Sequence, residues 1–191
     1  MIGFIVLSII GSVQPLSYGE LYRVDMNRRD LPLVSLQAGY GIDLTDSFSD
    51  LHSVEASAQI RLWKYIGAGI LYQHFFPKLS SSGQGLKDTE PLLEIDIPQP
   101  LWSVFLEPKL QVLVGDWNFF NIIPIEVDLL LGGGVGIMNE RNDIDQDGKF
   151  KISWLWTLEQ RFRLFSNQGL YLRFLGSRSG AFIGSGLTIS F

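Results

Sequence analysis

From Leu33 onward the chain alternates apolar and polar residues with a period of two, and turn residues interrupt the alternation at intervals. Because neighbouring side chains of an extended strand point to opposite faces, this period predicts strands with one apolar and one polar face. We expect eight strands, over residues 34–44, 54–62, 66–76, 102–114, 125–137, 151–164, 170–175 and 181–191. Eight antiparallel strands can close without a free edge, so the sequence predicts an all-β, eight-stranded, up-and-down barrel.

The charged residues of these strands share one face, opposite the apolar set. A soluble sandwich puts its apolar face in the core, whereas a membrane barrel turns the apolar face to lipid and the charges to the lumen. Six of the residues are acidic and six are basic, which would leave a lumen neutral by count. The twelve are Asp43, Glu55, Arg61, Glu107, Lys109, Glu126, Asp128, Lys151, Glu159, Arg161, Arg163 and Arg173.

Aromatic residues and turn lengths favour the membrane interpretation. Membrane barrels carry aromatic girdles at both interfaces, short periplasmic turns and long outer loops. The turns at 63–65 and 165–168 are tight, whereas the segments 77–100 and 138–149 are long. One expected girdle contains Trp63, Tyr65, Trp117, Phe119, Phe120, Phe165 and Phe191, and the other contains Phe48, Phe75, Phe76, Trp102, Phe150 and Phe174. The sequence thus predicts a transmembrane β-barrel with both chain ends in the periplasm.

The first 19 residues form a separate segment. Residues 1–13 are almost wholly apolar, too short to span a membrane as a helix, and small residues precede Glu20. This pattern predicts a secretory signal peptide, although it lacks the usual basic residue near its start; the alternative is a buried strand or helix of a soluble protein. We expect a periplasmic arm over 20–31 and the barrel over 32–191.

Composition excludes several functions. The chain has no cysteine, which rules out disulfides, a cysteine-based zinc site and a thiol nucleophile. Its net charge of −5 argues against nucleic-acid binding, which depends on clustered Lys and Arg.

The lumen charges form the main candidate site. An eight-stranded barrel is only wide enough for its own side chains, and unpaired buried charges are unfavourable, so we expect ion pairs. Ten of the twelve charges, all except Asp43 and Lys151, are the candidate lumen network, with Glu159, Arg161, Arg163 and Arg173 near one another. A solid polar plug is the main interpretation, and a narrow ion pathway is the alternative.

Two segments resemble bacterial outer-membrane barrels. The end of the chain, with Leu187, Ile189 and a terminal Phe191, resembles their C-terminal strand, and residues 119–136 resemble the central hairpin of the small "outer membrane β-barrel domain" family. The resemblance implies a bacterial outer-membrane location and recognition of the C-terminal strand by the barrel-assembly machinery.

Two further motifs have weak functional interpretations. Asp143, Asp145 and Asp147 with Gly148 match the start of a calcium loop, but Trp154 stands where a full loop has Glu. The segment is either a weak Ca²⁺ site or a solvated acidic turn, and we expect no other cofactor. The glycines at 132–136 do not form a nucleotide loop, because no Lys-Ser/Thr and no helix follow them.

The two histidines are the candidates for catalysis. Pairing of the second and third strands places His52 opposite Phe76 and His74 opposite Val54, on the lipid face near the outer end. Lipid-modifying barrels use a His and a Ser there, but His52 and Ser53 are adjacent and point to opposite faces. We therefore expect no enzyme activity.

The outer segments carry the remaining functional prediction. Segments 45–51, 77–100 and 138–149 each have a net charge of −2, so the acidic excess lies on the outer rim. We expect lipopolysaccharide to be held there through divalent cations, or a basic outer-surface partner to dock, while the arm 20–31 contacts a periplasmic partner or caps the barrel. The sequence favours a structural or interaction protein; a narrow pore, a lipid-modifying enzyme and a soluble lipocalin-like barrel are the alternatives.

Overall fold

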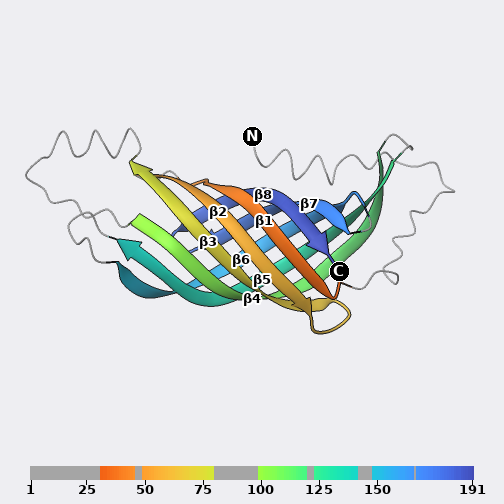
Figure 1. The fold of residues 1–191 in the computed structure, drawn as a ribbon, viewed down its shortest axis with the longest axis horizontal. Coiled ribbons are helices and arrows are strands. Elements are labelled where there is room, and N and C mark those ends of the chain that lie inside the picture. Colours follow the sequence, from red (N-terminus) through yellow and green to blue (C-terminus); the bar gives the residue numbers. More distant parts are fainter. Residues whose placement is uncertain (1–30, 46–48, 80–98, 120–122, 142–147, 166) are drawn as a thin grey trace, which may run out of the picture.

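The computed structural model describes residues 31–45, 49–79, 99–119, 123–141, 148–165 and 167–191. These residues form a closed barrel in which every strand is antiparallel to its neighbours and follows chain order (Figure 1). The strands are β1 (Val34–Asp43), β2 (Ser49–Arg61), β3 (Ile66–Leu79), β4 (Gln99–Phe119), β5 (Ile123–Arg141), β6 (Lys149–Arg163), β7 (Gln168–Ser177) and β8 (Gly180–Ser190). This is the predicted architecture.

Strand register agrees with the alternation of the sequence. β1 and β8 close the barrel, with Leu36 opposite Ile189. His52 lies opposite Phe76 and His74 opposite Val54, as predicted. Because side chains alternate along each strand, this register fixes which residues reach the lumen.

The two ends of the barrel differ. We call the end that carries Val34 and Phe191 the termini end, and the opposite end the loop end. The β2–β3 turn at the termini end is tight, with the Leu62 and Trp63 N–H groups both donating to the Ile66 carbonyl at 2.9 Å. At the loop end only Arg178 and Ser179 separate β7 from β8, and Gly180 has a φ of 143°, which favours glycine.

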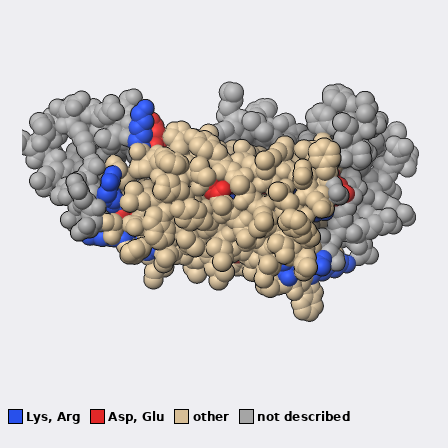
Figure 2. All heavy atoms as spheres, viewed as in Figure 1, with Lys and Arg blue, Asp and Glu red and all other residues tan. Residues whose placement is uncertain are grey.

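The outer surface of the barrel is apolar. Large apolar side chains face outward along every strand, among them Ile70, Leu106, Val135, Trp154 and Leu187. Figure 2 shows that Lys, Arg, Asp and Glu gather mainly at the two ends, while the middle of the visible face carries few of them. Within the part of the chain that the structure describes, no helix is long and apolar enough to cross a membrane.

Several strands are longer than predicted. β4 continues to Phe119 and β5 starts at Ile123, whereas we expected 102–114 and 125–137. β3 also runs to Leu79 and β5 to Arg141, so that parts of the expected loops 77–100 and 138–149 are strand. Backbone pairing continues past the last strictly alternating residue, and a register shift between Gln111 and Leu113 absorbs the break in alternation.

Phe75 departs from its predicted place in the outer girdle, whereas the predicted girdle residues Phe48 and Phe120 lie outside the described residues. Phe75 lies in the lumen, because its neighbours His74 and Phe76 occupy the outward positions. The outer girdle prediction was therefore wrong at this position.

Candidate functional site

Glu159 on β6 is the centre of the lumen charge network. Its side chain is fully buried and accepts hydrogen bonds from three cations on β4, β6 and β7. Lys109 Nζ lies 2.6 Å from Glu159 Oε2, Arg161 Nε lies 2.5 Å from Oε1, and Arg173 Nη2 lies 2.7 Å from Oε2. These hydrogen bonds cross the lumen, so one carboxylate links strands that are not adjacent in the barrel.

Two further carboxylates complete the network. Glu55 on β2 accepts a hydrogen bond from the Tyr171 hydroxyl at 2.6 Å and lies 3.3 Å from Arg173. Glu107 lies 3.3 Å from Lys109 and accepts a hydrogen bond from the Thr157 hydroxyl. The central network therefore contains three carboxylates and three cations, and each buried charge has an opposite charge beside it.

Glutamine amides, which were not among the candidate residues predicted from the sequence, extend the network. Gln37 Nε2 donates to Glu159 at 2.6 Å, while its Oε1 accepts from Arg173 at 2.6 Å. Arg161 Nη2 donates to Gln59 Oε1 at 2.5 Å. Both glutamines stand on the polar face in the sequence, and that position was the signal for their role.

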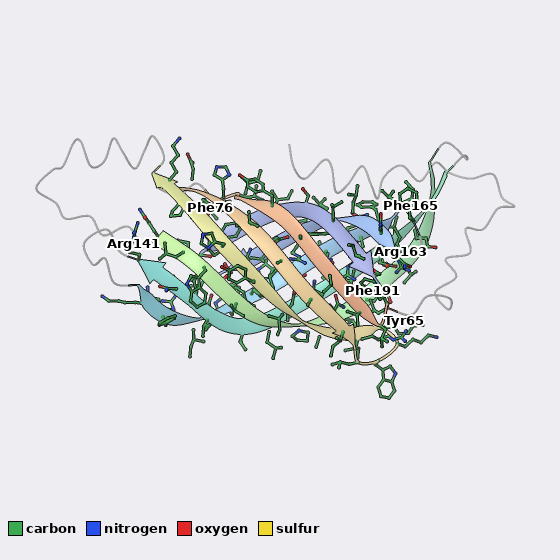
Figure 3. All side chains as sticks on the ribbon, in the orientation of Figure 1. Tyr65, Phe76, Arg141, Arg163, Phe165 and Phe191 are labelled. Carbon is green, nitrogen blue, oxygen red and sulfur yellow. The ribbon has the colours of Figure 1, made fainter. Side chains whose placement is uncertain are left out.

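Arg163 does not join this network, which corrects the expectation that it lies beside Glu159, Arg161 and Arg173. Its guanidinium lies 2.8 Å from Asp128 and 3.4 Å from Glu126, nearer the termini end. Asp128 also accepts a hydrogen bond from Gln111 at 3.2 Å. The side chain of Arg163 lies two residues farther along β6 than Arg161 and thus reaches a separate cluster (Figure 3).

The remaining strand charges lie toward the two rims. Arg61 donates through Nη1 to the Leu31 carbonyl at 2.9 Å, at the termini end. At the loop end Asp43 accepts from the Thr45 hydroxyl at 2.5 Å, and Lys151 pairs with Glu140. All twelve charges therefore lie on the lumen side or at its rims.

The loop-end half of the lumen contains an apolar cluster that was not predicted from the sequence. Its side chains are at most 4% exposed, and we call it the apolar plug: Leu51, Leu71, Phe75, Phe105, Leu155, Leu175 and Phe182. The available signal was a pair of consecutive apolar residues, such as Phe105-Leu106 or Phe174-Leu175, which puts one of the two in the lumen. Buried Gln73 and Ser103 lie on the same strands as Leu71 and Phe105, so the lumen holds apolar side chains beside the predicted polar ones.

The histidines lie on the outer surface near the loop end. His52 Nδ1 lies 2.7 Å from the Tyr40 hydroxyl, and the His74 ring packs edge-on against Phe76. Ser53 is buried in the lumen, on the other face of β2 from His52. Among the described residues no hydrogen bond joins either histidine to a serine.

Several predicted features lie outside the described residues. They are the signal peptide 1–19, the arm up to residue 30, most of the long outer segments, and the acidic residues Asp143, Asp145 and Asp147. Within the ranges described, no group of three His, Asp or Glu side chains could hold a metal ion.

The outer surface and the lumen together define the class of protein. A closed barrel with an apolar exterior and charges in its interior is a transmembrane β-barrel, because the exterior suits lipid and the interior does not. The outward, exposed side chains of Leu187, Ile189 and Phe191 belong to this exterior.

Comparisons with known proteins give solved structures of low sequence identity. No family model matches the sequence, and no curated protein matches it. Neisserial surface protein A (NspA) is 12% identical with a TM-score of 0.49, over 83% of this chain and 96% of that one. Ail, the attachment invasion locus protein of Yersinia pestis, is 10% identical with a TM-score of 0.41, over 84% and 99%. A chain titled "De novo design of transmembrane beta-barrels" is 12% identical with a TM-score of 0.46, over 85% and 99%.

Proposed function

We propose that this chain is a bacterial outer-membrane protein without catalytic function that serves as a structural or interaction protein at the cell surface. Its barrel is a closed anchor, and its segments 77–100 and 138–149 form the interaction surface. Function usually resides on loops that a rigid scaffold positions. The observation that carries the proposal is the packing of buried apolar side chains and paired charges in the lumen, which suits an anchor better than a pore.

The packing of the lumen favours an anchor over a pore. Buried apolar side chains pack together toward the loop end, and the ion pairs around Glu159 join strands across the lumen. Conduction would require ions to pass both a desolvated apolar layer and fixed charges that are already paired. A narrow pore is therefore the less favoured function.

The unequal heights of the strands favour the two long segments as the interaction surface. At the loop end β3 stays paired with β2 as far as Leu79 opposite Ser49, five residues past its last pair with β4. Likewise β6 stays paired with β5 as far as Lys149 opposite Glu140, six residues past its last pair with β7. The segments thus start from strands that extend beyond a neighbour at this end. Their acidic character suits lipopolysaccharide bridged by divalent cations, or a basic protein partner.

Location and assembly follow from the same surface. The outward row Leu187, Ile189 and Phe191 gives the barrel-assembly machinery an exposed apolar strand to recognise, and residues 1–19 would direct export. In this proposal Asp143, Asp145 and Asp147 bind at most a weakly held Ca²⁺.

Site-directed labelling tests which end faces the outside. The chain has no native cysteine, so Ser82→Cys in the long β3–β4 segment and Lys64→Cys in the termini-end turn can be compared directly. On intact cells we expect a membrane-impermeant maleimide to label the Ser82→Cys protein and to spare the Lys64→Cys protein until the outer membrane is disrupted. Labelling in the reverse order, or a protein absent from the outer-membrane fraction, would overturn the proposal.

The absence of catalysis is tested through the histidines. We expect His52→Ala and His74→Ala to leave the lipid A species of the membrane unchanged, because these rings contact Tyr and Phe side chains on the lipid face. If the acylation of lipid A changed with the presence of the protein and with either histidine substitution, the protein would be a lipid-modifying enzyme instead.

A further inference from the structure

The β4–β5 hairpin extends beyond the rest of the barrel at the termini end. β4 pairs with β3 only as far as Leu110 opposite Ile66, yet it continues to Phe119. On its other side β4 stays paired with β5 as far as Phe119 opposite Ile123. Figure 1 shows this hairpin curving away past the ends of the other strands.

One edge of this hairpin lacks a partner strand. Gln111 N–H donates to the Tyr65 carbonyl at 2.8 Å, and this is the last bond between β4 and the β3 side. Among the described residues, none forms a backbone pair with residues 112–119 on that side. Eight residues of strand, about 27 Å long, therefore present unpaired backbone groups.

The sequence of this edge gives it little protection against strand addition. Natural edge strands commonly carry lysine or proline, and residues 112–119 contain neither and have Asp116 as their one charged residue. Val112 and Leu113 are both exposed, because the register shift between Gln111 and Leu113 turns two consecutive apolar side chains outward. Such an edge is a template for the addition of another strand.

The N-terminal arm ends beside this edge. Leu31 is buried at the termini end, and its N–H donates to the Lys64 carbonyl at 3.2 Å. Lys64 precedes Tyr65, whose carbonyl accepts the hydrogen bond from Gln111 just before the free edge begins. The chain before Leu31 thus reaches the rim where the unpaired part of β4 leaves it.

Length, direction and charge of the arm match the edge. Residues 22–30 can extend over about 30 Å, the length of the unpaired strand. The chain before Leu31 leads to the rim while β4 runs away from it, so an arm on this edge would be antiparallel to β4. Tyr22 and Val24 alternate with polar residues, which suits a strand. The net charge of residues 22–30 is +1, opposite in sign to Asp116, Glu126 and Asp128 of the hairpin.

We propose that residues 22–30 add to the free edge of β4 as an antiparallel strand, making a three-stranded sheet below the barrel. This site lies at the termini end, whereas the proposed cell-surface role uses the loop end. The arm is then part of the folded protein rather than a tether for a separate partner.

Disulfide trapping tests the proposal in the full chain. With residue 30 at the rim beside residue 112, an antiparallel arm places residue 29 opposite Leu113 and residue 27 opposite Gly115. We therefore combine Arg29→Cys with Leu113→Cys and, separately, Asn27→Cys with Gly115→Cys, at a glycine with no atom within 4 Å of an added Cβ. Asn27→Cys with Thr45→Cys at the loop end is the matched control. A disulfide forms only when the two Cα atoms come within about 7 Å, so we expect intramolecular cross-linking at least about tenfold above the control in one of the edge pairs. Cross-linking at the control level, or only between two copies, would overturn the proposal.

Hydrogen exchange gives a second measurement without new cysteines. Proline cannot donate to a strand ladder, so Val24→Pro is expected to speed exchange at the amides of residues 112–119 by about tenfold or more, while Val24→Thr leaves it slow. Fast exchange over 112–119 in the unaltered chain would show a free edge and would contradict the proposal.

Discussion

Toward the loop end, seven buried apolar side chains pack in the lumen, whereas toward the termini end three carboxylates and three cations pair across it. The two regions are enclosed by the same strands and have the same outer surface. When an apolar side chain is truncated, the loss in the free energy of unfolding grows with the volume of the cavity that is left. When one member of a charge network is removed, the loss is largest if its partner charge stays buried and unpaired. The same barrel is therefore expected to respond differently to substitutions in its two halves.

The largest expected effect is at Glu159. Glu159→Leu leaves Lys109, Arg161 and Arg173 without their shared carboxylate, and we expect a loss of about 3–5 kcal/mol in the free energy of unfolding. The change is measured by urea titration of the barrel folded in lipid vesicles. Glu126→Ala, at a partly exposed carboxylate, is the control and should cost about 1 kcal/mol or less.

A double variant sharpens this prediction. Glu159→Leu combined with Lys109→Met leaves two acids and two bases in the network, so the combined loss should be smaller than the sum of the two single losses. Strict additivity would show that the ion pairs do not act as a unit.

The second effect compares one substitution on the two faces of the barrel wall. Leu71→Ala empties a fully buried position in the apolar plug and should cost about 3–5 kcal/mol, because the surrounding side chains collapse only in part. Leu106→Ala faces lipid, which fills the space, so only the transfer free energy of about 2 kcal/mol is lost. Equal losses in urea titrations would show that the plug is loosely packed.

The third effect concerns a glycine that makes room for the plug. A Cβ at Gly136 would lie 2.7 Å from Phe105 Cδ1 and closer still to the backbone of Val104. We expect Gly136→Ala to cost about 1–3 kcal/mol, whereas Gly115→Ala should stay within about 0.5 kcal/mol. A neutral Gly136→Ala in the same titration would place Phe105 elsewhere.

The smallest expected effect is a difference between the two charge clusters in how their contribution to stability depends on salt. Arg163 is partly exposed beside Asp128, whereas Arg173 is buried, so added salt should screen only the first cluster. The loss caused by Arg163→Ala, about 1–2 kcal/mol at low ionic strength, should shrink in 0.5 M NaCl, while the loss caused by Arg173→Ala stays unchanged. Equal salt dependence of the two would contradict the difference in burial.

Much of the barrel could be predicted because alternation is a local property. The register of β2 against β3 and the lumen position of Glu159 both follow from a period of two. The ends of the strands were harder to predict, since the extension of β4 depends on its pairing with β5 and not on alternation in the sequence. The apolar plug was missed because a lumen-facing leucine such as Leu71 has the same chemistry as a lipid-facing one. Which of two consecutive apolar residues turns inward is set by the register of the whole barrel.

Single-channel recording in planar bilayers tests the closed lumen most directly. The unaltered chain, inserted as a heat-modifiable barrel, should produce no discrete conductance steps, because the apolar plug and the paired charges pack in the lumen. Reproducible steps from the unaltered protein that are lost on boiling would contradict this account and show that the barrel is a pore.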